Sequence, residues 1–364
     1  MPAPLTDIIA SSTTSLVQVA LEPAFNAFNS LVMLGRAGKL SGLGEWIIKT
    51  SASMTREERQ RNELVTFGYY YAAIPLQSWP SFPAYLDHLE SLSPDVFRDK
   101  LMDAYSDMPC CEEYSELTVD RVMALESVDN YLEFLRQRFS TEHVDDKLES
   151  EAYAYVIDPP EMKRLITSHL RMMWDTYLEE EWQRIVPMLL DAKAAFEQVN
   201  YREMSKIETV EFITGKELQH DHWTSMIEKA EQIVFVPSAH VGPYTGKFMS
   251  GDTLGIVFRA RLPEGTQYYA PDLSRAEILV LLNALADDTR LRILQVVAGE
   301  GEMRSQEIMN ELELSQSATS RHLKQLSATG YLTERRCEGA KCYELNNDRV
   351  EDLVGAISSF LLDA

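Results

Sequence analysis

The stretch Leu314–Leu326 reads LSQSATSRHLKQL and decides how the C-terminal part of the chain folds. Ser315 is a typical N-cap residue, because its hydroxyl can accept from the free backbone amides that open a helix. Gly330 suits the left-handed residue that ends a helix. The apolar side chains that would face inward are Ala318, Leu323 and Leu326. The stretch therefore predicts a helix over residues 316–329.

A second helix precedes this one closely. Ser305 starts it and Leu312 is its last apolar residue, so about two non-helical residues separate the pair. Such a short turn forces an angled pair whose second helix can enter the major groove of DNA. The polar residues predicted to contact DNA from the solvent side of the second helix and from its cap are Ser315, Gln316, Ser317, Thr319, Ser320, Arg321, His322, Lys324 and Gln325.

The flanking residues complete a winged helix-turn-helix. Ser274 and Asp287 cap two earlier helices, residues 331–337 and 341–345 predict a β-hairpin, and a final helix follows. The hairpin adds three cations to the predicted DNA contacts: Arg335, Arg336 and Lys341. A capped polar helix or a basic hairpin is often only a solvated surface, but their order along this chain favours DNA binding.

Charge is distributed unevenly over the 364 residues, whose formal net charge is −23. Residues 274–364 hold 10 Lys and Arg against 15 Asp and Glu, and the rest of the chain holds 24 against 42. Five of the ten cations lie between Arg321 and Lys341. A specific DNA site needs only a local basic face, so the overall acidity does not exclude a double-stranded DNA partner.

Three segments resemble the arsenic-repressor (ArsR) family: LADDTRLRIL at 285–294, LSQSATSRHLKQL, and Glu338-Gly339 before Tyr343-Glu344-Leu345. The resemblance covers residues 274–362. It implies a homodimer, joined through the first and last helices of the domain, that reads a palindromic operator. The apolar residues of these two helices, which we predict to form the dimer interface, are Ile278, Leu281, Leu282, Leu285, Val350, Leu353, Val354, Ile357, Phe360 and Leu361.

The sequence departs from the family pattern at several positions. Asp288 replaces the usual Pro, and Glu313 replaces a usual Gly, which should strain the turn slightly. Metal-sensing members carry Cys in the third helix or Asp and His on the last, but residues 302–313 and 346–364 contain neither Cys nor His. We therefore expect a repressor that binds no metal or other cofactor at these positions, with any small-molecule effector acting through the N-terminal part.

The first 265 residues predict a larger, mainly helical domain with a small β-sheet. Alternating apolar residues predict a strand at 16–21, and two later strands at 232–240 and 253–262 could pair with it. Pro, Gly and Gln in residues 266–273 predict a linker to the winged helix at 274–364. The fold class expected is mainly α (α+β), and this arrangement resembles an uncharacterised extension found before some winged helices of this kind.

Three features of the N-terminal domain are candidates for function. An aromatic set could line an effector pocket, although such spacing more often belongs to an ordinary core: Trp46, Phe67, Tyr69, Tyr70, Tyr71, Trp79 and Tyr85. Gln219–His222 could begin a metal site, but an exposed polar turn is favoured. Cys110 with Cys111, and Cys337 with Cys342 across the hairpin, could have redox roles; reduced thiols are favoured.

No Gly-rich phosphate loop, nucleophile elbow or metalloprotease helix occurs, so we expect no enzyme. An N-terminal domain that binds protein partners, or one with residual enzymatic activity, remains an alternative. No stretch has the apolar length of a membrane span and the N-terminus lacks the pattern of a signal peptide, so a cytoplasmic protein is expected.

Overall fold

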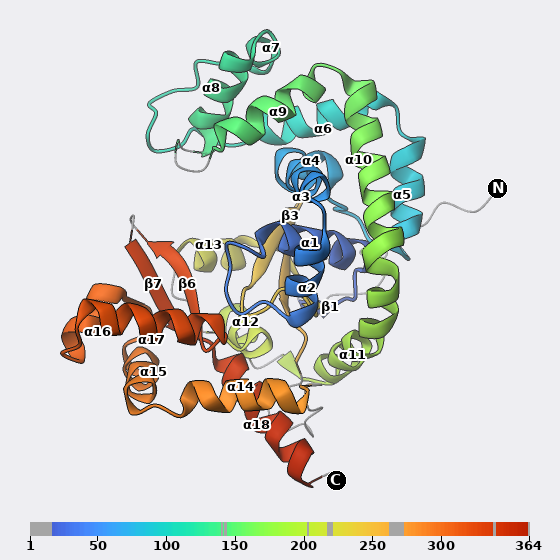
Figure 1. Cartoon of the computed structure of the whole chain (residues 1–364). Coiled ribbons are helices and arrows are strands. Elements are labelled where there is room, and N and C mark those ends of the chain that lie inside the picture. Colours follow the sequence, from blue (N-terminus) through green and yellow to red (C-terminus); the bar gives the residue numbers. More distant parts are fainter. Residues whose placement is uncertain are drawn as a thin grey trace.

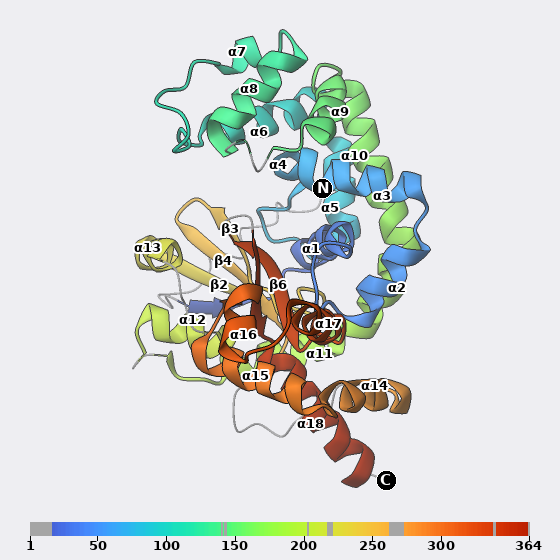
Figure 2. The same cartoon turned by 60° about the vertical axis from the view of Figure 1, so that its left-hand side comes forward.

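The computed structural model describes residues 17–139, 141, 144–201, 204–216, 221–261, 273–337 and 340–362. The fold is mainly α with two small sheets, which confirms the expected α+β class (Figures 1 and 2). Within this described part of the chain, no helix is long and apolar enough to cross a membrane.

A helical body makes up most of the N-terminal part. In Figure 1 the helices α10 and α11 follow one another along the right-hand edge, and α6 to α9 lie at the top. The helical elements are α1 (Pro23–Arg36), α2 (Glu45–Ser53), α3 (Arg56–Glu63), η2 (Leu64–Gly68), α4 (Tyr70–Ala73), α5 (Phe82–Ser91), α6 (Pro94–Ser106), α7 (Arg121–Ala124), α8 (Val128–Phe139), α9 (Asp146–Val156), α10 (Pro159–Met173), η4 (Trp174–Leu178), α11 (Glu179–Glu197), α12 (Lys206–Thr214) and α13 (Asp221–Lys229).

A four-stranded sheet occupies the centre of this body, in the order β1-β2-β4-β3. The strands are β1 (Val17–Val19), β2 (Gln232–Ser238), β3 (Gly246–Ser250) and β4 (Thr253–Arg259). The predicted pairing of the first strand is confirmed for β2, which runs parallel to β1, whereas β4 pairs in parallel with β2. Sequence reasoning missed β3, whose five residues lie between the two later predicted strands.

Both faces of the sheet are buried. Ile233 and Phe235 pack with residues of α11, α12 and α13, whereas the alternate residues Val234 and Val236 pack into the larger core around α1. Successive side chains of a strand point to opposite faces, so a continuous apolar run such as IVFV fits a doubly covered strand.

The C-terminal part is a winged helix-turn-helix with a core of its own. Its elements are α14 (Arg275–Leu285), α15 (Asp288–Glu300), β5 (Met303–Arg304), α16 (Ser305–Glu311), α17 (Gln316–Ala328), β6 (Leu332–Cys337), β7 (Ala340–Leu345) and α18 (Asn347–Leu362). The order matches the predicted one, with β5 added at the edge of the hairpin in the order β5-β7-β6.

The winged helix contacts the N-terminal body along a polar seam. Ser41, in the loop between α1 and α2, donates its hydroxyl to the carbonyl of Leu332 at 3.3 Å and accepts from the amide of Glu334 at 3.1 Å. Arg259, at the end of β4, pairs with Asp348 and Asp352 in the first turns of α18. The seam therefore ties the α1–α2 loop to the wing and the end of β4 to the last helix.

Candidate nucleic-acid interface

The N-terminal half of α17 presents a polar, exposed face. Ser315 caps the helix as predicted, accepting from the amide of Ala318 at 3.3 Å. The four exposed side chains of this half are Gln316, Ser317, Ser320 and Arg321, and exposed Lys324 follows them. Because the positive end of the helix dipole lies at the same place, this face favours the phosphates and base edges of a nucleic acid.

Two residues predicted on this face belong to the core instead. Thr319 is only 1% exposed and donates its hydroxyl to the carbonyl of Ser315 at 3.0 Å. His322 is 7% exposed, and its Nδ1 lies 3.9 Å from a carboxylate oxygen of Asp287, the cap of α15. Their assignment to the solvent side was therefore wrong. Thr319 satisfies a backbone carbonyl within α17 itself, and His322 positions α17 by lying against the cap of the neighbouring helix.

Gln325 is half-buried and also acts within the protein. Its amide oxygen accepts from Nη1 of Arg290 at 3.0 Å, and Nη2 of the same guanidinium donates to the carbonyl of Asn283 at 2.9 Å. Arg290 is itself 8% exposed. Gln325 thus links α17 to the C-terminal end of α14 through Arg290.

The turn before α17 carries the strain that the sequence predicted. Four residues separate α16 from α17, slightly more than the two expected. Glu313 has a φ of 51°, in the left-handed region that glycine adopts most easily. The amide of Leu314 closes the turn by donating to the carbonyl of Met309 at 3.0 Å.

The wing places its three cations in different settings. Arg335 is bound to Glu302, and Lys341 pairs with Glu334 at 2.5 Å, while Arg336 is exposed. Arg336 and Lys341 stand opposite one another in the β6–β7 register. The wing is thus basic at its outer end, where both side chains are exposed.

The expectation that Cys337 and Cys342 face each other across the hairpin is wrong. Cys337 stands opposite Ala340, and Cys342 stands opposite Arg335, two pairs further from the turn. The error arose from placing the turn at 338–340, whereas β7 begins at Ala340. Cys342 is buried, and Cys110 and Cys111 are free thiols.

The predicted dimerisation residues divide into two groups. Ile278, Leu281 and Leu353 are buried within the winged helix, and Leu285 and Ile357 are partly buried against its core. The others are exposed, together with two residues that the sequence analysis missed. This exposed set on α14 and α18 consists of Leu279, Val280, Leu282, Val350, Val354, Phe360 and Leu361.

The aromatic set packs into the N-terminal core. Trp46 stacks on His240 with 4.5 Å between ring centroids, and the Tyr85 hydroxyl donates to the carbonyl of Ala73 at 2.8 Å. The remaining rings, which also contact this core, are those of Phe67, Tyr69, Tyr70, Tyr71 and Trp79. These are the contacts of an ordinary hydrophobic core, which the sequence analysis gave as the alternative to an effector pocket.

The predicted metal candidate, Gln219–His222, lies outside the side chains that the structure describes. Within the described residues, no three metal-ligating side chains gather in one place.

Residues 287–334 match the arsR family of bacterial regulatory proteins. ArsR1, an arsenic resistance transcriptional regulator of Pseudomonas putida, is 40% identical over 85 residues, which are 23% of this chain and 66% of that protein. The transcriptional activator HlyU of Vibrio cholerae is 35% identical over 79 residues, 22% of this chain and 72% of that protein. This chain thus spans about two thirds of the length of these relatives.

Among solved structures, NolR from Sinorhizobium fredii is 35% identical and covers 25% of this chain and 96% of its own, with a TM-score of 0.20. The family match falls on the winged helix, whose elements follow the expected order. Through this C-terminal part, the chain belongs to the ArsR family of bacterial regulatory proteins.

Proposed function

We propose that the protein is a sequence-specific DNA-binding transcriptional regulator that binds a palindromic operator as a homodimer and represses by occluding a promoter. The exposed face of α17 carries this proposal, because Gln316, Ser317, Ser320 and Arg321 project together from the second helix of the helix-turn-helix. A glutamine or an arginine side chain can each form two hydrogen bonds with the edge of one base, and the serine hydroxyls can form hydrogen bonds with either bases or phosphates.

The core contacts of α17 support this role by fixing its orientation. His322 and Gln325 each contact another part of the domain, and Thr319 bonds to the cap of α17 itself, so the exposed residues are presented on a helix with a fixed orientation. A preorganised reading helix loses less conformational entropy on binding than a mobile one. Arg336 and Lys341, at the outer end of the wing, then supply phosphate contacts beside the groove.

The homodimer is supported by the exposed apolar set on α14 and α18. Leu279 is 56% exposed and Val354 60% exposed, although both lie on helices that pack against one another. Exposed apolar side chains gathered on two helices are often covered by a partner, and two-fold symmetry matches a palindromic operator.

The regulator is proposed not to use the metal positions of its relatives. The described helices α16 and α18 contain neither Cys nor His. ArsR1 is named for arsenic resistance, and a CadC homolog of Staphylococcus aureus, 32% identical over 78 residues, for cadmium resistance. In this chain, a signal is proposed to arrive through the N-terminal body and the seam.

The test is selection of genomic DNA fragments by the purified protein at two salt concentrations. The wild type should enrich a palindrome, and Arg321→Ala should weaken binding to it by about 1 to 3 kcal/mol if the side chain contacts a base or phosphate. The double variant Gln316→Ala/Arg321→Ala should lose enrichment. Higher salt should weaken all specific binding, because phosphate contacts release counterions.

A matched control removes the same two side-chain types far from α17. Arg164 and Gln198 are both exposed on the N-terminal body, so Gln198→Ala/Arg164→Ala should enrich the same palindrome as the wild type. Wild-type enrichment by the Gln316→Ala/Arg321→Ala variant would remove α17 from the interface. Transcription of a reporter gene placed behind the selected palindrome then tests whether the protein represses or activates. HlyU is named as an activator, and activation here would contradict the proposed repression.

A further inference from the structure

A buried polar network lies where α1, α2 and α11 meet the chain that follows β2. His240 is at its centre: Nδ1 of the ring lies 2.8 Å from the hydroxyl of Ser30 on α1, and Nε2 lies 2.8 Å from a carboxylate oxygen of Glu181 on α11. All three residues are buried, with exposed fractions of 3% or 4%. Both ring nitrogens therefore have partners, and the protons on the ring decide how each partner is bound.

The carboxylate of Glu181 requires a proton on Nε2 of His240. The guanidinium of Arg184 donates from Nη2 to Oε1 of Glu181 at 2.6 Å and from Nε to Oε2 at 2.7 Å, a paired contact typical of an ionised carboxylate. Burial opposes the charge of Glu181, but the bonds from His240 and Arg184 outweigh burial and hold the pKa of this carboxyl below its usual value. An ionised carboxylate can only accept, so Nε2 must donate to it.

The hydroxyl of Ser30 requires a second proton, on Nδ1. It lies 2.9 Å from the carbonyl oxygen of Asn26, one turn earlier on α1, and 2.8 Å from Nδ1 of His240. A carbonyl oxygen has no proton to give, so a hydrogen bond at 2.9 Å requires the hydroxyl to donate to it. The hydroxyl can then offer only a lone pair to Nδ1, and Nδ1 must donate as well.

The indole of Trp46 on α2 supports a charged ring. It stacks on His240 with 4.5 Å between the ring centroids and 19° between the planes. A cation over the face of an indole is attracted by the negative face of its π-system. The charged residues of α2, Glu45 and Lys49, pair with each other. Around His240, α2 therefore contributes an indole, α1 a hydroxyl, and α11 the carboxylate with its arginine.

We propose that His240 is a buried imidazolium, protonated on both nitrogens, and that it makes the seam with the winged helix sensitive to pH. Its partners resemble a hydrolytic triad, but Ser30 is buried and its hydroxyl is bound to its own helix, so we assign Ser30 as a positioning residue. As pH rises and the second proton is lost, Nδ1 becomes an acceptor facing a hydroxyl that already donates to Asn26. Glu181 loses its charged partner on the ring at the same time.

The network reaches the winged helix through the chain on both sides of the ring. Tyr244, four residues after His240, donates its hydroxyl to the carbonyl of Ser41 at 3.0 Å and accepts from the amide of Ser41 at 3.2 Å. Trp46 follows Ser41 by five residues. Ser41 in turn accepts from the amide of Glu334 on the wing. Loss of the charge on His240 should therefore loosen both supports of the loop that contacts the wing.

Heteronuclear NMR of the full chain, with isotopic nitrogen in its histidines, tests the protonation directly. The two nitrogens of an imidazolium resonate close together, whereas those of a neutral ring resonate far apart. At about pH 7.5 we expect the imidazolium pattern for His240. His169 is an internal reference, because burial lowers its pKa to about 4 and its ring should be neutral in the same spectrum. A spectrum in which no histidine shows the imidazolium pattern would overturn the proposal.

Two variants identify the signal and test its cause. Glu181→Gln and Ser30→Ala each remove one partner of the charged ring, so each should convert the imidazolium pattern to the neutral one. Glu180→Gln, at an exposed position on the same helix, is the matched control and should leave the pattern unchanged. An imidazolium pattern that persists in both Glu181→Gln and Ser30→Ala would overturn the assignment of the charge to His240.

Amide hydrogen exchange at Glu334 tests the link to the seam, because this amide donates to Ser41. Compared at one pH, exchange at this amide should be at least about fivefold faster in Glu181→Gln than in Glu180→Gln. Equal rates would overturn the link to the wing.

The effect of pH on DNA binding rests on the proposed function, whereas the NMR and exchange measurements use no DNA and stand without it. Between about pH 6.5 and 8.5, the affinity of the wild type for the selected palindrome should change at least about threefold more than that of Glu181→Gln. Equal changes in the two proteins would overturn the regulatory role of His240 alone.

Discussion

Glu149 is an acidic side chain placed where its charge is disfavoured. It lies on α9 beside the buried tyrosines 69, 105 and 131, and its buried Oε2 has no hydrogen-bond partner in the structure. Burial raises the pKa of Glu149 to about 8, and the nearby Asp145 carboxylate adds to the shift. At neutral pH the folded protein therefore holds this carboxyl group mainly in its protonated form.

The shift of Glu149 predicts a stability that falls as pH rises. The unfolded chain releases this proton near pH 4.5 and the folded chain near pH 8, so the stabilisation is complete below 4.5 and is lost by about pH 8. Glu149→Gln keeps the shape of the side chain without its charge. From pH 5 to pH 8.5, the unfolding free energy of the variant minus that of the wild type should therefore rise by about 2 kcal/mol or more. Urea denaturation at several pH values measures this gain. Glu126→Gln, at an exposed position, is the control; parallel pH profiles for wild type and Glu149→Gln would contradict the prediction.

At the scale of the element, α17 shows what the sequence could and could not predict. The cap of this helix, its length and the left-handed glycine that follows it can all be predicted from local chemistry, and the structure confirms them. Thr319 and His322 were misplaced because residue type was weighed above spacing. With Leu323 and Leu326 they stand at i, i+3, i+4 and i+7, which is the spacing of a buried helical face. The spacing could have identified them, whereas their hydrogen-bond partners could not be read from sequence.

The exposed face of α18 leads to a prediction about assembly. If Val354 lies in the proposed dimer interface, Val354→Asp would place a carboxylate in an apolar contact without a partner, and the dimer should dissociate. Sedimentation velocity should show a wild-type dimer and a variant monomer. Val122→Asp is the matched control, because Val122 is 70% exposed on α7 and outside that surface. A wild-type monomer, or a Val354→Asp dimer, would contradict the proposed interface.

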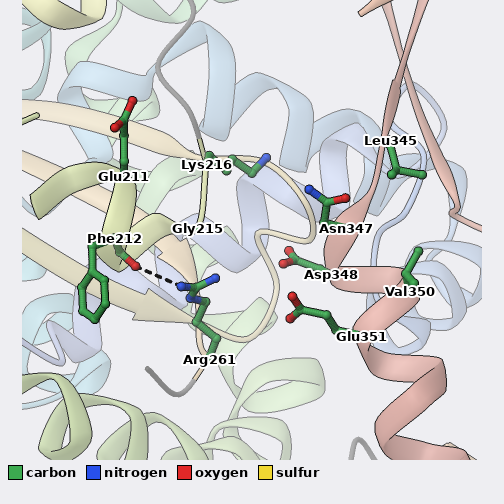
Figure 3. Close-up of a pocket in the computed structure, with 10 residues that line it drawn as sticks. All are labelled: Glu211, Phe212, Gly215, Lys216, Arg261, Leu345, Asn347, Asp348, Val350 and Glu351. Atoms are coloured by element: carbon green, nitrogen blue, oxygen red, sulfur yellow. Dashed lines mark hydrogen bonds between the residues drawn. The ribbon is translucent and has the colours of Figure 1, made fainter. Parts of the chain in front are cut away.

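At the scale of the whole molecule, the seam joins residues far apart in sequence. Ser41 contacts β6, some 290 positions away, and Arg259 contacts α18, about 90 positions away. No sequence pattern near Ser41 or Arg259 indicates either contact. Helical periodicity and capping residues therefore predicted the N-terminal body and the winged helix, but not how these two parts meet. The same reason hid a pocket at this seam, which is lined by residues of α12, the chain after β4, the end of β7 and α18 (Figure 3).

Arg259 is the residue on which the seam can be tested. Burial lowers its pKa, but Asp352 and Asp348 outweigh this and hold the pKa above its ordinary value, so the guanidinium is a permanent partner for both carboxylates. Arg259→Asp should leave three carboxylates together and reduce the unfolding free energy by about 1 to 3 kcal/mol, less than for a fully buried pair because the side chain is 29% exposed.

Hydrogen exchange should then show weaker protection in the first turns of α18, and Arg259→Asp/Asp352→Arg should restore part of it by reversing the pair. Arg164→Asp breaks an exposed pair with Glu161 and should leave the unfolding free energy nearly unchanged. Unchanged protection of α18 in Arg259→Asp would mean that the contact between Ser41 and the wing holds the two bodies together without the ion pair, and that α18 is not the route by which the N-terminal body reaches DNA.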